Sequence, residues 1–302
     1  MSSKSPYTYD NGTLINRFGI QDQDELQKAE AGHTAMRRMQ LQVGLGPRGG
    51  EFDLQHLKAL HRHLFQDVYE WAGTTRGEWT TIEGRGFMPP TGLRKETSFM
   101  PADLIAERLG RAFAELRRDD YLQGTTREEF AQKGAKLLAD VNYAHPFREG
   151  NGRTQREFMS QLAAQAGHRL DWGAVTQERM RVDSIQASPR YSAETGALPP
   201  NLDGLTQMFR EITGRDQTAL LKEAIVHLRN EGLNPNAVYL TAAQHGQTYE
   251  GERLEGTPRL GLVLLEGNKL LVTPPQSFQK AVETDKGVRF TASYDKGMGM
   301  EM

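Results

Sequence analysis

The sequence predicts a mainly α-helical domain that carries a short β-hairpin and is followed by a small β domain. Three observations predict this architecture. Up to about residue 230, apolar residues recur mostly at the spacing of helices. A β-prone run at 79–88 interrupts the helices and is followed by two prolines. After residue 235, short strand-like runs alternate with glycine, asparagine and proline signals.

The composition indicates a globular protein and excludes several kinds of site. The 302 residues include 37% hydrophobic and 25% charged residues, and the net charge is −2. A charge this close to neutral provides no general basic field for nucleic acid, so any nucleotide affinity must be local. The absence of cysteine excludes disulfides, thiolate metal sites and a cysteine nucleophile. No Sec-type signal and no apolar run long enough to span a bilayer is visible, so no membrane partner is expected.

The first part of the chain predicts a tail and two helices. Residues 1–20 are polar and turn-rich, which predicts a flexible N-terminal tail. The next segment is expected to be a helix, because Asp22 and Glu25 have the spacing of a capping box. His61 and His63 lie on a second helix and face different ways, so we expect surface residues rather than a metal site. That helix is predicted by apolar residues at helical spacing, namely Leu54, Leu57, Leu60, Leu64, Val68 and Trp71.

The middle of the chain predicts the hairpin and two further helices. Trp79–Ile82 and Phe87–Met88 are short β-prone runs separated by glycines. A helix opens with Thr125 and Glu128, again at capping-box spacing, and runs to about residue 143. Another helix, between the hairpin and the helix that opens at Thr125, is predicted by apolar residues at helical spacing, namely Leu104, Ile105, Leu109, Phe113 and Leu116.

The C-terminal part predicts helices followed by strands. Helical patterns fit residues 173–182, 203–213 and 217–230. The runs AVYLTAA, QTYEGERL, RLGLVLLE and KLLVTPP predict short strands, with a turn at Gly267–Asn268. The final residues from Asp285 onward show no strong pattern.

The stretch HPFREGNGRTQREF at 145–158 carries residues suited to phosphate chemistry. A helix begins at about Asn151, which makes Gly150, Asn151 and Gly152 a tight turn at its N-terminus. Backbone N–H groups converge in such a turn and form an anion-binding nest.

Charged side chains add to this turn. Arg153 and Arg156 project from one face of the helix, and a polyphosphate matches their guanidiniums, the backbone donors and the helix dipole. Glu149 would repel a bare phosphate, whereas Mg²⁺ bound between carboxylate and phosphates removes the conflict. His145 is able to act as a base near neutral pH. Together these residues predict a phosphate-transfer centre that works by positioning and charge stabilisation.

HPFREGNGRTQREF resembles the signature of the Fic-domain family, HPFx(D/E)GNGRxxR, and matches it at every defining position. The likeness covers about residues 15–215. A Fic domain followed by a small β domain looks most like the Bartonella effector proteins, in which an OB fold follows the Fic domain. Further segments that resemble the family are NRFGI (16–20), LFQDVYEWAGTTR (64–76) and AGHRLDW (166–172).

The resemblance implies a mainly α fold, with a Fic-type helical domain, a short β-hairpin flap and a small C-terminal OB-like β-barrel. The expected boundaries are a flexible tail at 1–20, the Fic domain at 21–215, a connecting helix at 216–234, and the OB-like domain with a C-terminal tail at 235–302.

The resemblance also implies an activity, which is Mg²⁺-dependent transfer of AMP from ATP to a Tyr, Ser or Thr hydroxyl of a target protein. His145 would deprotonate the hydroxyl, and Glu149 would hold Mg²⁺ on the α- and β-phosphates. Asn151 and the amides around Gly150 and Gly152 would form the anion hole.

The family pattern assigns roles to two arginines and to the hairpin as well. Arg153 would contact the β-phosphate and Arg156 the γ-phosphate. The hairpin corresponds to the flap, whose edge would hold the target segment by strand addition. Thr81, Ile82 and Phe87 are the flap candidates.

Partners and location are implied in the same way. Many family members are restrained by a helix with the pattern (S/T)xxxE(G/N), which this chain lacks. Either the protein is unrestrained or a separate small antitoxin supplies the helix in trans, and the resemblance favours the antitoxin. The Bartonella effectors also imply a type IV secretion effector involved in virulence, found in the bacterial cytoplasm before secretion and in the host-cell cytoplasm afterwards. Their secretion-signal domain is not visible, which is consistent with a fragment of a longer protein.

Several alternatives stay open. The same fold could transfer phosphate or another nucleotide moiety, or it could serve as a non-catalytic protein-binding module. The two arginines could form a solvated face paired with neighbouring glutamates, which explains their charges but not the glycines. Phe87 and Met88 could be plain core packing. Lys269, Arg259 and Tyr249 form no basic-aromatic stripe, so a structural role is expected there rather than nucleic-acid binding.

Overall fold

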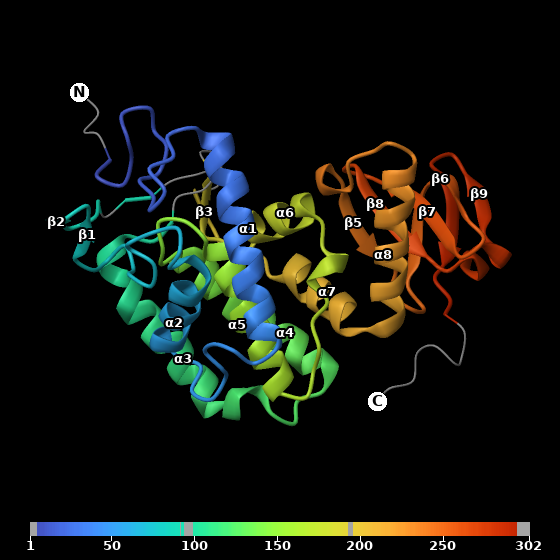
Figure 1. Ribbon diagram of the computed structural model, residues 1–302. Coiled ribbons are helices and arrows are strands. Elements are labelled where there is room, and N and C mark those ends of the chain that lie inside the picture. Colours follow the sequence, from blue (N-terminus) through green and yellow to red (C-terminus); the bar gives the residue numbers. More distant parts are fainter. Residues whose placement is uncertain (1–4, 91, 94–98, 193–195, 295–302) are drawn as a thin grey trace. The chain divides into compact units, whose positions relative to one another are not determined.

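The computed structural model describes residues 5–90, 92–93, 99–192 and 196–294 (Figure 1). The chain divides into two compact units, residues 1–123 with 137–167 and residues 124–136 with 168–302. Helix α4 (Arg127–Ala144) begins in the second unit and ends in the first, directly before the HPFREGNGR stretch.

The helices of the first unit lie where the sequence predicts them, except that α2 ends at Phe65 and leaves Val68 and Trp71, which the prediction placed on it, outside the helix. Asp22 caps α1 because its carboxylate accepts a hydrogen bond from the Glu25 N–H at 2.8 Å, which confirms that part of the predicted capping box. Asp53 caps α2 in the same way through the N–H of His56. The helices are α1 (Gln23–Gln42), α2 (Leu54–Phe65), α3 (Ile105–Arg118) and α5 (Asn151–Gln165), with 3-10 turns at Ala102–Leu104 and Asp120–Leu122.

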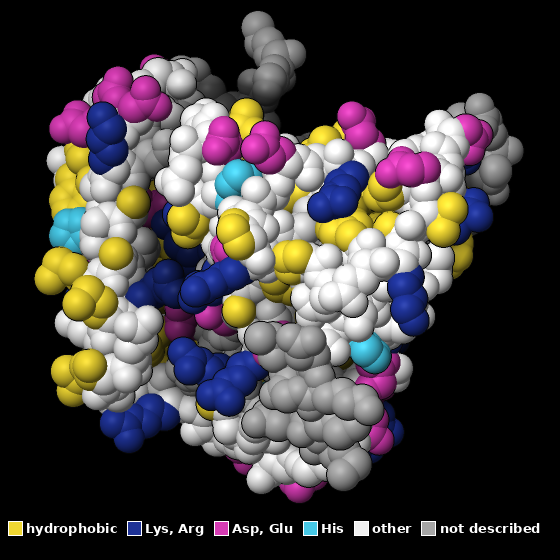
Figure 2. Space-filling model, turned by 90° about the vertical axis from the view of Figure 1, so that its right-hand side faces the viewer, with side chains coloured by type: hydrophobic (Ala, Val, Ile, Leu, Met, Phe, Trp, Pro, Cys, Tyr) yellow, Lys and Arg dark blue, Asp and Glu magenta, His cyan; other side chains and the backbone are white. Residues whose placement is uncertain are grey.

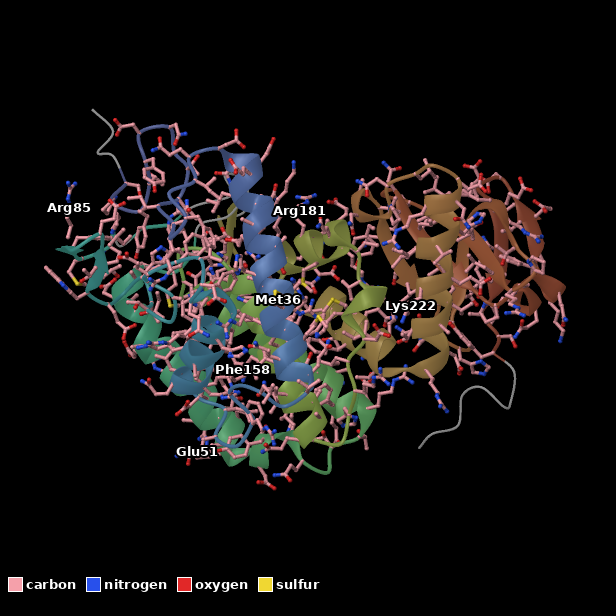
Figure 3. The ribbon with its side chains drawn as sticks, in the orientation of Figure 1. Met36, Glu51, Arg85, Phe158, Arg181 and Lys222 are labelled. Atoms are coloured by element: carbon pink, nitrogen blue, oxygen red, sulfur yellow. The ribbon has the colours of Figure 1, made fainter. Side chains whose placement is uncertain are left out.

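The core of the first unit forms where α2 packs against α1, α3 and α5. Leu57, Leu60 and Leu64 share one face of α2 and are fully buried. Phe158 of α5 lies among the helices (Figure 3) and packs edge-on against Phe52, with ring centroids 5.3 Å apart. Burial of each such side chain contributes about 1.5–3 kcal/mol. This packing fixes α2 against α5, whose N-terminus carries the predicted site.

The N-terminal segment differs from the expectation of a loose tail. Residues 5–20 turn back on themselves, and Tyr7 is only 3% exposed. Its ring packs edge-on against Trp71 and Phe87, with centroids 5.6 and 5.2 Å away. The Asn16 amide bonds to four backbone groups of the same segment. The segment is ordered despite its polar composition, because the buried ring of Tyr7 and the hydrogen bonds of the Asn16 amide hold it in place.

The predicted hairpin is present as β1 (Thr80–Ile82) and β2 (Arg85–Phe87). The strands pair antiparallel, with Thr80 opposite Phe87 and Ile82 opposite Arg85. The turn residues Glu83 and Gly84 have φ of 48° and 75°, as a two-residue hairpin turn requires. Arg85 beside this turn points outward from the hairpin (Figure 3).

The second unit contains α6 (Gln177–Gln186), α7 (Asp203–Thr213) and α8 (Arg215–Asn230). The α7 bounds match the prediction, whereas α6 begins at 177 rather than at 173. Residues Trp172–Ala174 form a 3-10 turn instead, and Thr176 then caps α6 through the N–H of Arg179.

The capping box predicted for α4 lies one residue further along the chain. The Glu129 carboxylate accepts from the N–H of Thr126, and the Thr126 hydroxyl accepts from the N–H of Glu129. Glu128, which the prediction placed in the box, instead pairs with Arg210. Thr125 and Thr126 both fit the sequence pattern, and the contact with Arg210 favours the second register.

The C-terminal β-module, residues 239–291, is a six-stranded sheet in the order β5-β8-β7-β6-β10-β9. β5 and β8 are parallel, and the other neighbouring pairs are antiparallel. Within the described residues β5 and β9 do not pair, so the sheet is not closed and the expected barrel is not confirmed. The strands are β5 (Tyr239–Ala242), β6 (Thr248–Thr257), β7 (Leu260–Leu265), β8 (Lys269–Thr273), β9 (Val282–Thr284) and β10 (Gly287–Thr291).

Helix α8 packs against β5, β7 and β8 of this sheet. Its buried residues Leu221 and Ala224 lie on one face, as the helical pattern predicts. β10 lies in the terminal stretch for which no pattern was evident, and its Val288 and Phe290 join the core of the β-module. A separate two-stranded pair, β3 (Arg190–Ser192) and β4 (Gly196–Leu198), was not predicted. Short 3-10 turns lie at Pro235–Ala237 and Pro275–Lys280.

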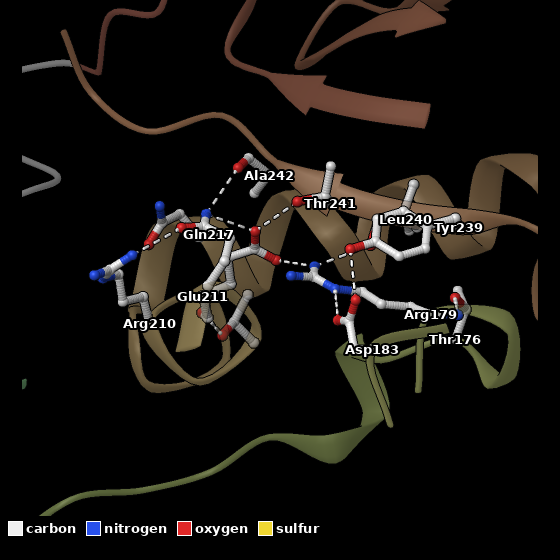
Figure 4. Close-up of polar contacts among 12 residues, drawn as sticks. Thr176, Arg179, Asp183, Arg210, Glu211, Gln217, Tyr239, Leu240, Thr241 and Ala242 are labelled. Carbon is white, nitrogen blue, oxygen red and sulfur yellow. Dashed lines mark hydrogen bonds and ion pairs between the residues drawn. The ribbon is translucent and has the colours of Figure 1, made fainter. Parts of the chain in front are cut away.

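A buried ionic cluster joins α6, α7 and β5 within the second unit (Figure 4). The guanidinium of Arg179, 1% exposed, pairs with Asp183 and Glu211. Tyr239 donates to Asp183 at 2.8 Å, and Thr241 donates to Glu211 at 2.8 Å. Burial lowers the pKa of Arg179, but the two carboxylates outweigh this effect and raise it. The cluster therefore ties the β-module to two helices through charge-assisted bonds.

Surface charge is mixed. On the face drawn in Figure 2, acidic side chains and lysine or arginine side chains are interspersed, so neither sign covers it. Within the described residues, no helix combines the length and apolar character required to cross a bilayer.

Candidate active site

The turn before α5 is built around Gly150. This residue is the N-cap of α5 and has φ 82° and ψ 3°, in the left-handed region. A Cβ added to it would lie 2.3 Å from the ring of Phe65. Glycine is therefore required twice at this position, for the backbone conformation and for the close approach of α2. The first N–H groups of α5 have no acceptor within the helix and remain directed at its N-terminal end.

Alanine substitutions at the two glycines of the turn are expected to differ in effect. Gly150→Ala should lower the free energy of unfolding by about 2 to 5 kcal/mol, through left-handed strain and overpacking against Phe65. Gly152→Ala meets only the mobile end of the Arg156 side chain, 3.3 Å away, and should stay within about 1 kcal/mol. Urea unfolding of both variants checks this, and equal losses would contradict the strain argument.

Asn151 braces the loop rather than pointing its amide at a ligand. Its Oδ1 accepts from the N–H of Phe147 at 2.9 Å, and its Nδ2 donates to the Phe147 carbonyl at 2.7 Å. The side chain is 3% exposed. Its predicted part in the anion hole is thus left to its backbone N–H at the first position of α5.

His145 follows α4 directly and has an unusual backbone conformation for a non-glycine residue, with φ 42°. Its ring stacks on Phe99 at 3.8 Å between centroids, with 18° between the planes. Arg76 holds the backbone of this loop, because Nε donates to the His145 carbonyl at 2.8 Å and Nη2 to that of Ala144 at 3.1 Å. Burial lowers the pKa of Arg76 to about 10, which leaves it charged near neutral pH. A strained, clamped and stacked imidazole is held in one orientation.

Glu149 places its carboxylate over the turn. Its Oε1 accepts from the N–H of Gly150 at 2.9 Å and lies 3.8 Å from Nη2 of Arg153. The side chain is 34% exposed, so it is within reach of a ligand. A single carboxylate beside phosphate-binding groups fits Mg²⁺, which commonly takes one or two carboxylates together with substrate phosphates. Among the described residues no cluster of three or more acidic or histidine side chains is arranged for a metal, so phosphates would have to complete the coordination.

Arg153 is engaged with α1. Its guanidinium pairs with Glu30, which is 8% exposed, and lies over the ring of Phe65 at 4.7 Å. Tyr69 donates to the other oxygen of Glu30. Burial and the neighbouring Glu30 raise the pKa of the Tyr69 hydroxyl, so it remains a donor. Arg153 is therefore fixed in place by a buried anion, beside the carboxylate of Glu149.

Arg156 has different surroundings. Its guanidinium lies beside Gly152 and is half-buried. It makes no hydrogen bond or ion pair within the described part of the chain. Burial, and then the charges of Arg38 and Arg153, lower its pKa. A partly desolvated cation next to two others and a helix N-terminus is a strong site for an anion.

His61 is a buried residue, so the expectation of a surface position was wrong. Its ring is completely buried and stacks on Phe147, with centroids 3.8 Å apart. Nδ1 accepts from the N–H of Gly73 at 2.8 Å, and Nε2 lies 3.0 Å from the Glu149 carbonyl. Burial lowers the pKa of His61 to about 3, so it is neutral at physiological pH. His63, by contrast, is half-buried and contacts the Arg37 carbonyl.

Comparison with known proteins identifies this arrangement. The model of the Fic/DOC family matches residues 51–163, which include α2, the hairpin and the whole turn. A probable protein adenylyltransferase of Sinorhizobium fredii is 43% identical over 159 residues, which are 52% of this chain and 74% of that protein. The chain belongs to the Fic/DOC family.

Two further similarities extend beyond the Fic motif. A protein adenylyltransferase of Bartonella henselae is 35% identical over 249 residues, 81% of this chain. The aligned region is 44% of that protein, so the chain spans less than half of the length of this relative. The solved structure of the type IV secretion system effector protein BepA superposes with a TM-score of 0.78 at 32% identity and covers 96% of both chains. The similarity thus includes both the Fic helices and the β-module.

The Fic hairpin presents its predicted target-binding residues unequally. Thr81 is exposed, Ile82 is 3% exposed and belongs to the core, and Phe87 is half-buried against Tyr7. The structure therefore places only the Thr81 side chain toward solvent, while Ile82 and Phe87 anchor the hairpin. The same outer face carries Trp79 and Met88, whose exposed fractions are 63% and 56%.

Sequence reasoning missed several residues that shape this Fic site. Arg76, Phe99, Glu30 and His61 come from four other segments of the chain. Arg76 is the last residue of the segment LFQDVYEWAGTTR (64–76), which resembles the family but to which the resemblance assigns no role. For Phe99 and Glu30 the local sequence carries no signal, because their partners lie 46 and 123 residues away along the chain.

Proposed function

We propose that this Fic chain transfers AMP from ATP to a Tyr, Ser or Thr hydroxyl of a target protein. The observation that carries this proposal is Arg156, a half-buried guanidinium that makes no hydrogen bond or ion pair with a carboxylate in the described residues and lies beside the N-terminus of α5. Desolvation and two neighbouring arginines make that position costly unless an anion binds. The γ-phosphate of ATP meets this need, and the N–H groups of Gly152 and Arg153 serve the phosphates that precede it.

The remaining residues take roles around that phosphate chain. His145, held by Phe99 and Arg76, accepts the proton of the attacking hydroxyl at a ring nitrogen. Arg153 and the amide of Gly150 stabilise charge near the β-phosphate. Glu149 would hold Mg²⁺, which when bound neutralises phosphate charge and orients the α-phosphate.

The target would be held at the flap. β1 and β2 pair only with each other in the described residues, so each keeps a free edge for strand addition. Thr81 supplies a polar contact on the outer face, and Trp79 and Met88 supply apolar area around it. This arrangement supports an extended target segment with an apolar side chain near the modified hydroxyl.

The first experiment distinguishes transfer of AMP from transfer of phosphate. The chain is incubated with Mg²⁺, a lysate of candidate target proteins and ATP labelled on the α- or the γ-phosphate. Covalent label from α-labelled ATP alone supports AMP transfer. Label from γ-labelled ATP alone would instead assign a phosphotransferase, and no label from either would favour a non-catalytic binding module.

The Arg156→Ala variant is expected to bind Mg–ATP about 10- to 100-fold more weakly, because a charge-assisted hydrogen bond contributes about 1.5–3 kcal/mol. Arg117→Ala is the matched control, since Arg117 is an arginine of the same unit that pairs with Glu51 at the surface and is not among the charges that act on Arg156. Calorimetric titration of both variants measures the difference. Unchanged affinity in Arg156→Ala would show that the γ-phosphate binds elsewhere.

Regulation and location are proposed from the same family. We propose that a small antitoxin supplies an inhibitory helix to Arg156, because this guanidinium could form an ion pair with a glutamate of that helix in place of a phosphate. The similarity to BepA supports a type IV secretion effector that acts in host cytoplasm.

We also propose that the β-module is a relative of OB folds, with a Fic domain at 21–215, a connecting helix at 216–234 and a C-terminal β domain at 235–302. The bulge between Leu254 and Thr257 in β6 supplies the curvature such a fold needs.

A further inference from the structure

We propose that His61 is a positioning residue that holds the Glu149–Gly150 peptide in the orientation required for phosphate binding. The inference rests on the proposed function in one respect, which is that phosphate binds at the turn before α5. His61 touches neither the phosphate position nor the target, so it would act only through this peptide.

The hydrogen bonds of His61 define a single tautomer. The N–H of Gly73 can only donate, so Nδ1 must be the acceptor at 2.8 Å. The Glu149 carbonyl can only accept, so Nε2 must carry the proton at 3.0 Å. Both contacts require the same neutral ring, with hydrogen on Nε2. Stacking on Phe147 and Phe65, at 3.8 and 4.8 Å between centroids, fixes the plane of the ring.

Peptide geometry carries this restraint to the anion site. In a trans peptide the C=O and the N–H point in opposite directions. The Glu149 carbonyl points to His61 on the buried side, and the N–H of Gly150 consequently faces the opposite side, where it donates to the Glu149 carboxylate at 2.9 Å. That carboxylate occupies the place of a ligand anion. His61 therefore decides whether the anion site presents an N–H or a carbonyl oxygen.

The restraint is needed because the peptide precedes a glycine. Rotation of the Glu149–Gly150 peptide would move Gly150 from φ 82° to a negative φ, which glycine adopts as readily. The rotated peptide would direct a carbonyl oxygen at the phosphate and repel it. A fully buried donor on the far side opposes this rotation, since leaving the Glu149 carbonyl and the ring N–H without partners in the core is costly.

Two substitutions separate the donor from the acceptor of His61. In His61→Asn, the side-chain oxygen can still accept from Gly73, but no donor reaches Glu149. In His61→Gln, the longer amide can donate to the Glu149 carbonyl. His56→Asn is the control, because His56 lies on the same helix and bonds to Gln161 of α5, away from the turn. The probes are Mg–ATP and adenosine, and melting temperature reports folding.

We expect His61→Asn to bind Mg–ATP at least about tenfold more weakly with adenosine affinity unchanged, and His61→Gln to recover most of the loss. His56→Asn should bind both probes as the parent chain does. Unchanged Mg–ATP affinity in His61→Asn, or equal losses for ATP and adenosine, would overturn the proposal.

A measurement on the parent chain keeps the test independent of both variants. ¹⁵N NMR should show a neutral ring protonated at Nε2, with that proton slow to exchange. A ring protonated at Nδ1 would refute the proposal even if neither variant folds. If the parent chain binds no nucleotide at all, the proposed function fails, whereas a shifted Gly150 amide signal in His61→Asn would still support the role of His61 and an unshifted signal would refute it.

Discussion

Replacing His145 with alanine is expected to lower the rate of the proposed AMP transfer by about 10²- to 10⁴-fold, the usual contribution of a general base. Affinity for Mg–ATP should stay within about twofold, because the imidazole acts on the hydroxyl in the transition state and not on the bound nucleotide. The structure favours this separation, since the ring stacks on Phe99 and its backbone is held by Arg76. Single-turnover transfer and calorimetric titration measure the two quantities.

The control for this variant is His33→Ala, which removes another imidazole of the same unit, stacked on Phe18 outside the turn. It should leave both transfer and affinity unchanged. Transfer at the parental rate in His145→Ala would show that another group accepts the proton. A large loss of ATP affinity would instead place the ring in contact with the nucleotide.

Replacing Arg179 with alanine is expected to lower the free energy of unfolding of the second unit by about 3 to 5 kcal/mol. Asp183 and Glu211, both fully buried, would then face one another without a cation, and Arg179 also donates to the Leu240 carbonyl of β5 at 3.0 Å. Burial already raises the pKa of Asp183, so this carboxylate depends on its partner to stay charged. Chemical denaturation monitored on the β-module measures the loss.

Arg181 provides a matched control on the same helix. It pairs with Glu178 at 2.7 Å, but its side chain is 46% exposed. Surface pairs of this kind contribute at most about 1 kcal/mol, so Arg181→Ala should be nearly silent. Comparable losses in both variants would mean that the buried cluster has no special weight in the second unit.

Local patterns predicted most of the fold. Leu57, Leu60 and Leu64 marked the buried face of α2, and Asp22 marked the start of α1, because both signals depend only on near neighbours in the chain. Predictions failed where a residue far away in the sequence determined the local conformation. The contact with Arg210 selects the capping register of α4, and Tyr7 orders a polar segment by packing on Trp71 and Phe87.

In the candidate site, too, the features that depend on neighbouring residues were predicted, and those that depend on tertiary contacts were not. The left-handed Gly150 and the start of α5 at Asn151 follow from the motif itself. The partners that orient this motif do not, because Arg76 and Glu30 reach it through tertiary contacts alone. His61 was misplaced for a related reason: on an amphipathic helix a histidine is usually polar surface, and only its bonds to Gly73 and Glu149 explain its burial.

The contact between the Glu149 carboxylate and the N–H of Gly150 has a consequence for selectivity. The Glu149 carboxylate, which belongs to the chain itself, already occupies the proposed anion site at this turn and competes there with dissolved anions. Inorganic phosphate or sulfate brings nothing that would draw the carboxylate away. Under the proposed function, a nucleotide that carries a divalent ion would make this carboxylate a metal ligand, so the turn would bind the metal complex of a nucleotide in preference to inorganic phosphate or sulfate.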